Sequence, residues 1–423
     1  MKRSKYMVGI VMLTFFVISF LTNIFGPLVP DIIKGFNLSL TLVAILPFAF
    51  FIAYGVISIP AGMLLEKYKE KKIMVTAFLV AFAGSLILAL FPNYLSALGS
   101  LFLIGCGMAM LQVVINPLMR TTGGEAHFAF FSVMGQLVFG LASFLSPMIF
   151  SALMRRAGAA PQTLVWVVFY QAFVAVFIAL IAAALWLRIP RVVLAENEKA
   201  GGFSAYRGLM AERLVQLFFL GIVAYVGTEQ SLANWMSQFL STYHHFSPAI
   251  EGANAVGLFW GLMAIGCLLG LVLLKLLDSK VVLGSFTILA FACVGLALFG
   301  PAQIALWAFP ASGFFLSVMF SIIFSLALNS VSQHHGAFSG ILCTGILGGA
   351  VVPLLVGVLG DRFGLRLAMT SVFATLGFIL SIAWWAQPLI RNETVGPREL
   401  VRLLGRRDAD RHVASEEQLR KNP

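Results

Sequence analysis

A single carboxylate lies deep in an apolar stretch of this sequence, beside amide side chains at helical spacing. Glu229 falls inside the otherwise uncharged run 214–240, and Gln230, Asn234 and Gln238 are spaced four residues apart in the same run. Residues four apart share one face of a helix. A charge at the centre of a bilayer costs at least ~2.5–3.5 kcal/mol, so such a residue usually marks an ion, proton or substrate pathway. The pattern predicts a polar pathway in which Glu229 is the ionisable group.

Uncharged polar side chains lie at similar depth in other apolar runs. Amides both donate and accept hydrogen bonds, as the hydroxyls of a sugar require, and tryptophan rings offer faces on which a sugar can stack. No Lys or Arg lies near the centre of any span, which disfavours a charged substrate. For any one amide, the alternative is a hydrogen bond to a neighbouring helix. We predict a site for a neutral sugar or polyol formed by Asn23, Gln112, Asn116, Gln136, Gln230, Asn234, Trp235 and Trp260.

The composition indicates a membrane protein. The chain has 423 residues, of which 60% are hydrophobic and 11% are charged, against about 25% charged residues in soluble domains. The net charge of +11 is explained by topology, because Lys and Arg collect in cytoplasmic loops. Basic patches interleaved with aromatic residues are absent, so we expect no nucleic-acid partner. The four cysteines are widely separated in apolar runs, a pattern that favours neither a metal site nor a disulfide framework.

Polar breaks divide the apolar sequence into segments long enough to cross a bilayer as helices. The expected fold is an all-α membrane protein with twelve spans, at 7–32, 40–65, 72–91, 94–119, 127–153, 164–188, 214–240, 252–275, 280–299, 302–330, 336–360 and 365–388.

Charge divides the chain and predicts its orientation. A six-helix bundle over 1–188 and another over 214–388 are joined by a basic loop at 189–213, and a polar tail follows at 389–423. The N-terminus, the loop between the second and third spans, the central loop and the tail hold most of the basic residues. The bias of Lys and Arg towards the cytoplasm predicts that both termini are cytoplasmic. We expect a multi-pass protein of the bacterial inner membrane that works as a monomer in the lipid bilayer.

The two bundles share an internal repeat. Pro147 precedes Arg155 by eight residues, and Pro353 precedes Asp361 by the same distance. Parallel six-helix repeats with a substrate site between them are the architecture of major facilitator transporters. The spacing therefore predicts two related halves with a site near the midplane.

Several motifs resemble the family of fucose–proton symporters and glucose/galactose permeases, over nearly the whole chain. The stretch Gln112–Pro117 after Gly105-Cys-Gly107 is similar to that family's fourth helix. The runs Tyr225–Glu229 and Ser339–Asp361 are similar to its seventh and eleventh helices. The resemblance implies a sugar transporter with the major facilitator fold, and no enzyme.

The resemblance also locates candidate gating residues. The run Pro60–Lys67 occupies the loop signature between the second and third helices, with Glu66 in place of the usual Asp. Glu66 and Lys67, together with Asp361 and Arg362 at the opposite ends of the helices, are our candidates for gating.

The sequence departs from the family at positions that affect coupling and specificity. Members related to the fucose symporter have an acidic residue where this chain has Gln112, and an Asp shortly after the residue that resembles Asn23. Here Phe139 replaces a polar residue, and Cys267 replaces an arginine common in the family. We assign coupling to Glu229, because apolar surroundings disfavour a charged carboxylate and would let it carry a proton near neutral pH.

We therefore predict a secondary active transporter for a neutral sugar or polyol that needs no cofactor and is driven by protons, with sodium as the alternative ion. Phe139 and Cys267 favour the alternative of an exporter or uniporter for a less hydrophilic molecule. A membrane sensor that uses the tail at 391–423 as its contact surface is the third hypothesis.

Overall fold

The computed structural model describes residues 5–23, 28–30, 32–33, 37–123, 128–157, 165–186, 203–331 and 335–389. The predicted tail at 389–423 lies outside these residues except for Leu389, as does the first part of the central loop. Apolar runs broken by short polar segments fold into helices throughout the described part. The helices are α1 (Lys5–Asn23), α3 (Leu40–Leu90), α4 (Tyr94–Gly123), α5 (Phe128–Ala157), α6 (Val165–Trp186), α7 (Phe203–Ala211), α8 (Arg213–His244), η4 (Pro248–Gly252), α9 (Ala253–Leu276), α10 (Ser279–Phe299), α11 (Ala302–Leu316), α12 (Met319–Leu328), α13 (His335–Thr344), η5 (Gly345–Leu347), α14 (Gly348–Phe363), α15 (Leu365–Met369) and α16 (Ser371–Trp385).

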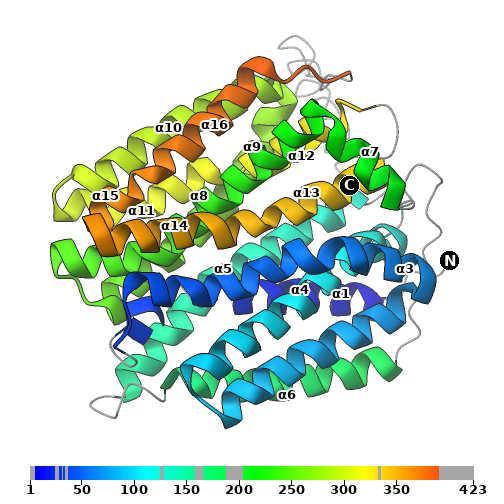
Figure 1. Cartoon of the computed structure of the whole chain (residues 1–423), viewed down its shortest axis with the longest axis horizontal. Coiled ribbons are helices and arrows are strands. Elements are labelled where there is room, and N and C mark those ends of the chain that lie inside the picture. The colour runs from blue at the N-terminus through cyan, green and yellow to red at the C-terminus, as the bar shows by residue number, and fades with distance from the viewer. Residues whose placement is uncertain are drawn as a thin grey trace, which may run out of the picture.

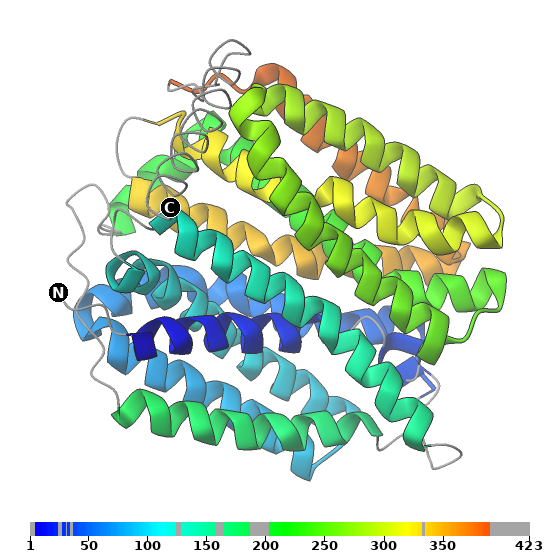
Figure 2. The same cartoon turned by 180° about the vertical axis from the view of Figure 1, so that it is seen from behind.

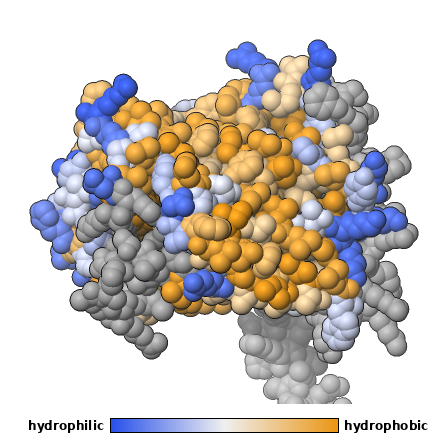
Figure 3. All heavy atoms as spheres, turned by 60° about the horizontal axis from the view of Figure 1, so that its bottom comes forward, coloured by the Kyte–Doolittle hydropathy of each residue, from blue (hydrophilic) through white to orange (hydrophobic). Residues whose placement is uncertain are grey.

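The helical architecture confirms the expected all-α membrane fold. Ten segments of the described residues are long and apolar enough to cross a bilayer, and two shorter apolar helices run over Val11–Asn23 and Leu137–Ala152. Together they account for the twelve predicted spans. Apolar side chains cover most of the face seen in Figure 3, and hydrophilic side chains gather towards its two ends. This distribution fits a bundle whose middle lies in lipid.

Some predicted spans are joined or interrupted in the structure. The second and third spans form one helix, α3, which is interrupted only where Lys69 has a φ of 69° and a ψ of 166°. The predicted span 302–330 divides into α11 and α12 at Ser317 and Val318. The predicted span 336–360 contains the 3₁₀ turn η5, where helices pack closely: a Cβ at Gly345 would lie 3.0 Å from Ile222.

The central loop contains a helix that the sequence analysis did not predict. In α7, Tyr206 and Leu209 are buried, while Arg207 and Gly208 are exposed. The Tyr206 hydroxyl lies 3.1 Å from a Cβ built at Gly340 on α13, and 4.0 Å from one built at Gly62 on α3. The two buried side chains are three positions apart and so lie on one face of this short helix, and Tyr206 contacts α3 and α13.

The two halves meet on two sides of the molecule. Figures 1 and 2 show α3 beside α13 and α14 on one side of the molecule, and α5 beside α9 on the other. Small residues allow the close approach: a Cβ at Gly357 would lie 2.7 Å from the Leu40 carbonyl oxygen, and one at Gly140 would lie 2.6 Å from Ala264. The α5–α9 contacts run from Gly140 towards the end of α5, and Figure 2 shows the two helices separating in the other direction.

Candidate functional site

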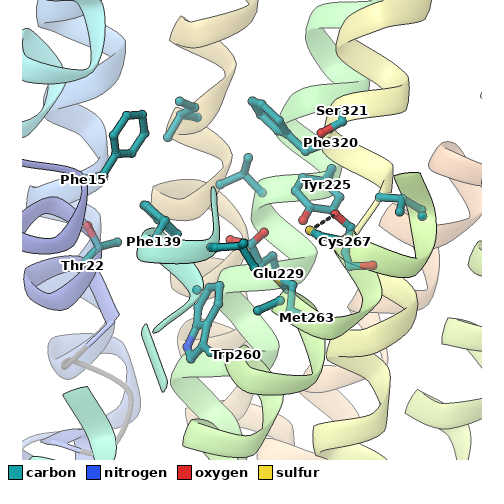
Figure 4. A pocket seen from close by; sticks show the side chains of 18 of the residues that line it. Phe15, Thr22, Phe139, Tyr225, Glu229, Trp260, Met263, Cys267, Phe320 and Ser321 are labelled. Carbon is teal, nitrogen blue, oxygen red and sulfur yellow. Dashed lines mark hydrogen bonds between the residues drawn. The ribbon is translucent and has the colours of Figure 1, made fainter. Parts of the chain in front are cut away.

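A cavity of about 350 Å³ lies where the two halves meet. Its volume falls at the small end of the range for small-molecule sites, ~300–1,000 Å³. Helices α1, α3, α4 and α5 contribute one side of the lining, and α8, α9 and the junction between α11 and α12 contribute the other. Figure 4 shows Phe15, Thr22 and Phe139 on one side, facing Tyr225, Glu229 and Cys267.

Glu229 lines this cavity from α8, and it is the only carboxylate among the described lining residues. The Gln230 side-chain amide donates to Glu229 Oε1 over 3.0 Å. Tyr225, one helical turn earlier, faces the same carboxylate. The carboxylate is thus held by two uncharged partners and remains partly exposed to the cavity.

Two other predicted binding residues join Glu229 and Gln230 in the lining. Gln112 reaches it from α4, and Trp260 from α9. The Trp260 ring packs edge-on against Phe259 with a centroid separation of 5.2 Å. Its indole N–H is buried and has no hydrogen-bond partner among the described residues. This arrangement leaves a donor for a bound molecule.

Three predicted residues lie outside the cavity lining, in the packing between helices. The Asn23 side-chain amide donates to the Ser19 carbonyl over 3.0 Å and to the Ser143 hydroxyl over 2.9 Å. The Trp235 indole donates to the Pro353 carbonyl over 3.1 Å. Asn234 is buried beside it on α8. In this structure, Asn23 and Trp235 join helices; for Asn23 this is the alternative that we gave for an amide.

Two further predicted residues cannot be placed in or out of the site. The side chains of Asn116 and Gln136 lie outside the described part of the structure, although α4 and α5 carry both positions.

Three serine and threonine residues that the sequence analysis did not single out line the cavity: Thr22, Ser317 and Ser321. Ser317 lies at the junction between α11 and α12, where its carbonyl accepts from the Cys267 thiol over 3.3 Å. Serine and threonine often bond their own helix, so their sequence positions alone do not reveal a site. The apolar residues before and after Ser317 give no sign of the helix break.

The candidate gating residues have different surroundings. The Asp361 carboxylate accepts the backbone N–H groups of Leu40 and Thr41, each over 2.8 Å, and so joins the end of α14 to the start of α3. The neighbouring Arg362 is exposed. In the middle of α3, beside the interruption at Lys69, the Lys67 ammonium lies 5.2 Å from the centre of the Tyr68 ring. The Glu66 side chain is outside the described part of the structure.

Comparison with known proteins identifies the family. The model of the Major Facilitator Superfamily matches residues 11–345. This chain belongs to that superfamily. Within the superfamily, a glucose/galactose transporter of Brucella abortus is 30% identical over 379 residues, covering 87% of this chain and 90% of the relative. The L-fucose-proton symporter of Escherichia coli K12 is 25% identical over 378 residues, covering 83% of this chain and 86% of the symporter.

Solved structures of the superfamily share the fold. The crystal structure of the Escherichia coli fucose:proton symporter matches with a TM-score of 0.67 at 21% identity, over 91% of this chain and 100% of that one. The D-xylose-proton symporter matches with a TM-score of 0.73 at 11% identity, over 92% of this chain and 99% of that one. The family resemblance inferred from sequence is confirmed, and the chain is a transporter-family protein rather than an enzyme.

Proposed function

We propose that this protein carries a neutral sugar or polyol across the bacterial inner membrane by alternating access, coupled through Glu229. One observation carries the proposal: the cavity between the halves is lined by uncharged donors and acceptors and by a single described carboxylate. The relatives named as glucose/galactose transporters support the choice of a sugar.

The two halves are in contact at one end of the bundle and apart at the other, which supports alternating access. At one end, Asp361 of α14 joins the start of α3, and α5 packs on α9. At the other end, α5 and α9 separate, and cavity-lining residues such as Leu137 and Leu271 are exposed. A bound molecule that favours one arrangement over the other shifts their populations.

The surroundings of Glu229 support a role in coupling. Tyr225 and Gln230 partner its carboxylate, and no Lys or Arg is among the described lining residues. Gain or loss of a proton would change the net charge of the cavity, since no cationic side chain among the described lining residues compensates it. Binding of sodium to the same carboxylate is the alternative form of coupling.

The distribution of basic residues supports the orientation. Lys67, Lys71, Lys72 and Arg207 lie at the end of the bundle where the cavity opens. Because positive charge collects on the cytoplasmic side, we assign this end to the cytoplasm, which makes the conformation inward-facing. Both termini are then cytoplasmic, and one chain holds the whole cavity, so a monomer suffices.

Uptake of labelled D-glucose and D-galactose into proteoliposomes tests the function. We expect accumulation under an inward proton gradient that a protonophore abolishes, and loss of this accumulation in Glu229→Gln. Glu212→Gln is the matched control, because Glu212 precedes α8 at its exposed end. Gradient-driven uptake of the same size in Glu229→Gln would remove the coupling role, and accumulation driven only by sodium would change the ion.

The apolar part of the lining favours a second candidate, an exporter or uniporter of a less hydrophilic molecule. Phe15, Ile18, Leu137 and Phe139 present hydrocarbon to the cavity. Binding of apolar compounds by purified protein that neither binds nor transports sugars would support this second function.

A further inference from the structure

The two sides of the cavity differ in chemistry. Polar groups from Tyr225, Glu229 and Gln230 on α8 lie on one side, with Trp260 of α9 and Ser321 of α12. Phe15 and Ile18 of α1 and Leu137 and Phe139 of α5 form much of the other. An unmodified hexose carries hydroxyls around its whole ring, and most of those facing the second side would lose water without gaining partners, because among the described residues only Gln112, Tyr54 and Thr22 bring polar side-chain groups to it.

The hydroxyl groups near the apolar side are already engaged. The Ser19 hydroxyl lies 2.6 Å from both the Ser143 hydroxyl and the Phe139 carbonyl oxygen. Ser143 also bonds the Phe139 carbonyl, over 3.0 Å. Thr22 donates to the Ile18 carbonyl over 2.8 Å. The Ser19 contacts join α1 to α5, and the Thr22 bond engages the one of these hydroxyls that lines the cavity.

The apolar side continues to the outer surface of the bundle. Leu137 of α5 and Leu268 of α9 line the cavity and are 38% and 43% exposed. One turn along α5, Leu141 is 52% exposed, and next to Leu268 on α9, Ile265 is 56% exposed; neither lines the cavity. Residues three or four apart lie on one helix face, so the rim of the cavity is continuous with the lipid-facing surface.

We propose that the substrate is amphiphilic: a sugar or polyol head group that carries an alkyl or acyl chain. The head group hydrogen-bonds the polar side formed by α8, α9 and α12. The chain lies along Phe15, Leu137 and Phe139 and leaves the cavity beside Leu268, between α5 and α9, towards the bilayer. This inference rests on the proposed function, because it names the class of polyhydroxy molecule that the same cavity takes.

Alkyl glycosides of increasing chain length test the inference. Binding of methyl, butyl and hexyl β-D-glucosides and β-D-galactosides is measured on the protein in nanodiscs, with empty nanodiscs correcting for partition into lipid. Burial of a methylene favours binding by about 0.8 kcal/mol, which is a factor of about four in affinity for each methylene. We expect the butyl compounds to bind tens of times more tightly than the methyl compounds.

A matched pair of variants locates the chain. Leu137→Asn should remove most of the dependence on chain length, measured as the ratio of butyl to methyl glycoside affinity within the same variant. Leu141→Asn makes the same change one turn further on α5, outside the cavity, and should keep the full dependence. If Leu137→Asn does not fold, Leu137→Ala should reduce the dependence to a smaller extent.

The outcomes separate this inference from the function on which it rests. Affinity that does not rise with chain length, in protein that still takes up free D-glucose or D-galactose, overturns the amphiphile and leaves the sugar transporter. Equal chain-length dependence in Leu137→Asn and Leu141→Asn overturns the path between α5 and α9. Protein that binds neither the alkyl glycosides nor the free sugars contradicts both proposals.

Discussion

Two buried tryptophans show how side chains of one type take different roles at the scale of single residues. The Trp260 N–H lacks a partner among the described residues and its ring lines the cavity, whereas the Trp235 N–H bonds the Pro353 carbonyl. Replacing Trp260 by Phe removes only the donor and keeps an aromatic ring. A net hydrogen bond contributes ~0.5–1.5 kcal/mol, so we expect substrate affinity to fall by about two- to tenfold with little change in melting temperature.

The Trp235→Phe variant should show the opposite result. Loss of its bond to Pro353, which joins α8 to α14, should lower the free energy of unfolding by ~1 kcal/mol and leave affinity nearly unchanged. Equilibrium binding and thermal melting of both variants check the pair. A fall in affinity with Trp235→Phe alone would reverse the roles assigned here.

The sequence predicts only part of the site. Helical spacing shows which residues share one face of a helix, but not which other helix that face contacts. Glu229, Gln230, Gln112 and Trp260 line one cavity, as predicted. Four residues advance a helix by slightly more than a turn of 3.6 residues, so a row spaced by four winds around α8. By Gln238 the row has left the cavity, and that amide donates to Thr242 instead. Which residues face the other half depends on packing that no single segment encodes.

At the scale of elements, the start of α3 is held by the opposite half. Ser39 caps Leu42, and Asp361 accepts the N–H groups of Leu40 and Thr41. A carboxylate at a helix N-terminus is stabilised by the unpaired N–H groups and by the helix dipole. Loss of the charge in Asp361→Asn should raise the population in which these two helix ends separate by about two- to fivefold.

Spin labels at the exposed positions 42 and 367 check this expectation. Leu42 lies near the start of α3, and Leu367 lies on α15, just beyond Asp361. The distance distribution should gain a longer component in Asp361→Asn. Arg362→Gln is the control, because this exposed neighbour also loses a charge. A distance distribution that is unchanged in Asp361→Asn and altered in Arg362→Gln would show that Arg362, and not Asp361, holds these helix ends together.

At the scale of the whole molecule, a second contact between the halves lies at the opposite end of the bundle. Tyr206 of α7 lies between Gly62 of α3 and Gly340 of α13, and so between the two halves. In the alternative conformation we expect the halves to approach each other here, where the ring would oppose their contact. We therefore expect Tyr206→Ala to favour closure at that end and to lengthen the distance between labels at 42 and 367.

Because the two contacts lie at opposite ends and favour the same conformation, their effects should combine. Sites far apart with no shared partner usually add in free energy. The double variant Asp361→Asn with Tyr206→Ala should change the ratio of the two populations by the product of the single factors. Arg207→Ala, on the exposed face of α7, should leave the distances unchanged. A double variant that matches either single variant would show that one contact controls both ends.

The fold was more predictable than the inner details of its helices. The length of the apolar runs identified the spans, because a bilayer sets that length. The helical path through Lys69, the junction at Ser317 and the helix around Tyr206 were missed. The junction and the short helix make contacts with distant residues, Cys267 against Ser317 and Gly340 against Tyr206, which leave only a weak local pattern.

The two sides of the Asp361 contact differ in how well they tolerate substitution. One partner contributes a side chain, but the other contributes only main-chain N–H groups at Leu40 and Thr41. Every residue except proline carries that group. Substitutions at Leu40 and Thr41 therefore leave the contact nearly unchanged, whereas almost any substitution of Asp361 removes it. Among related sequences, we expect the identity of the acidic residue to persist while its partners vary, so covariation between these positions should be weak although they touch.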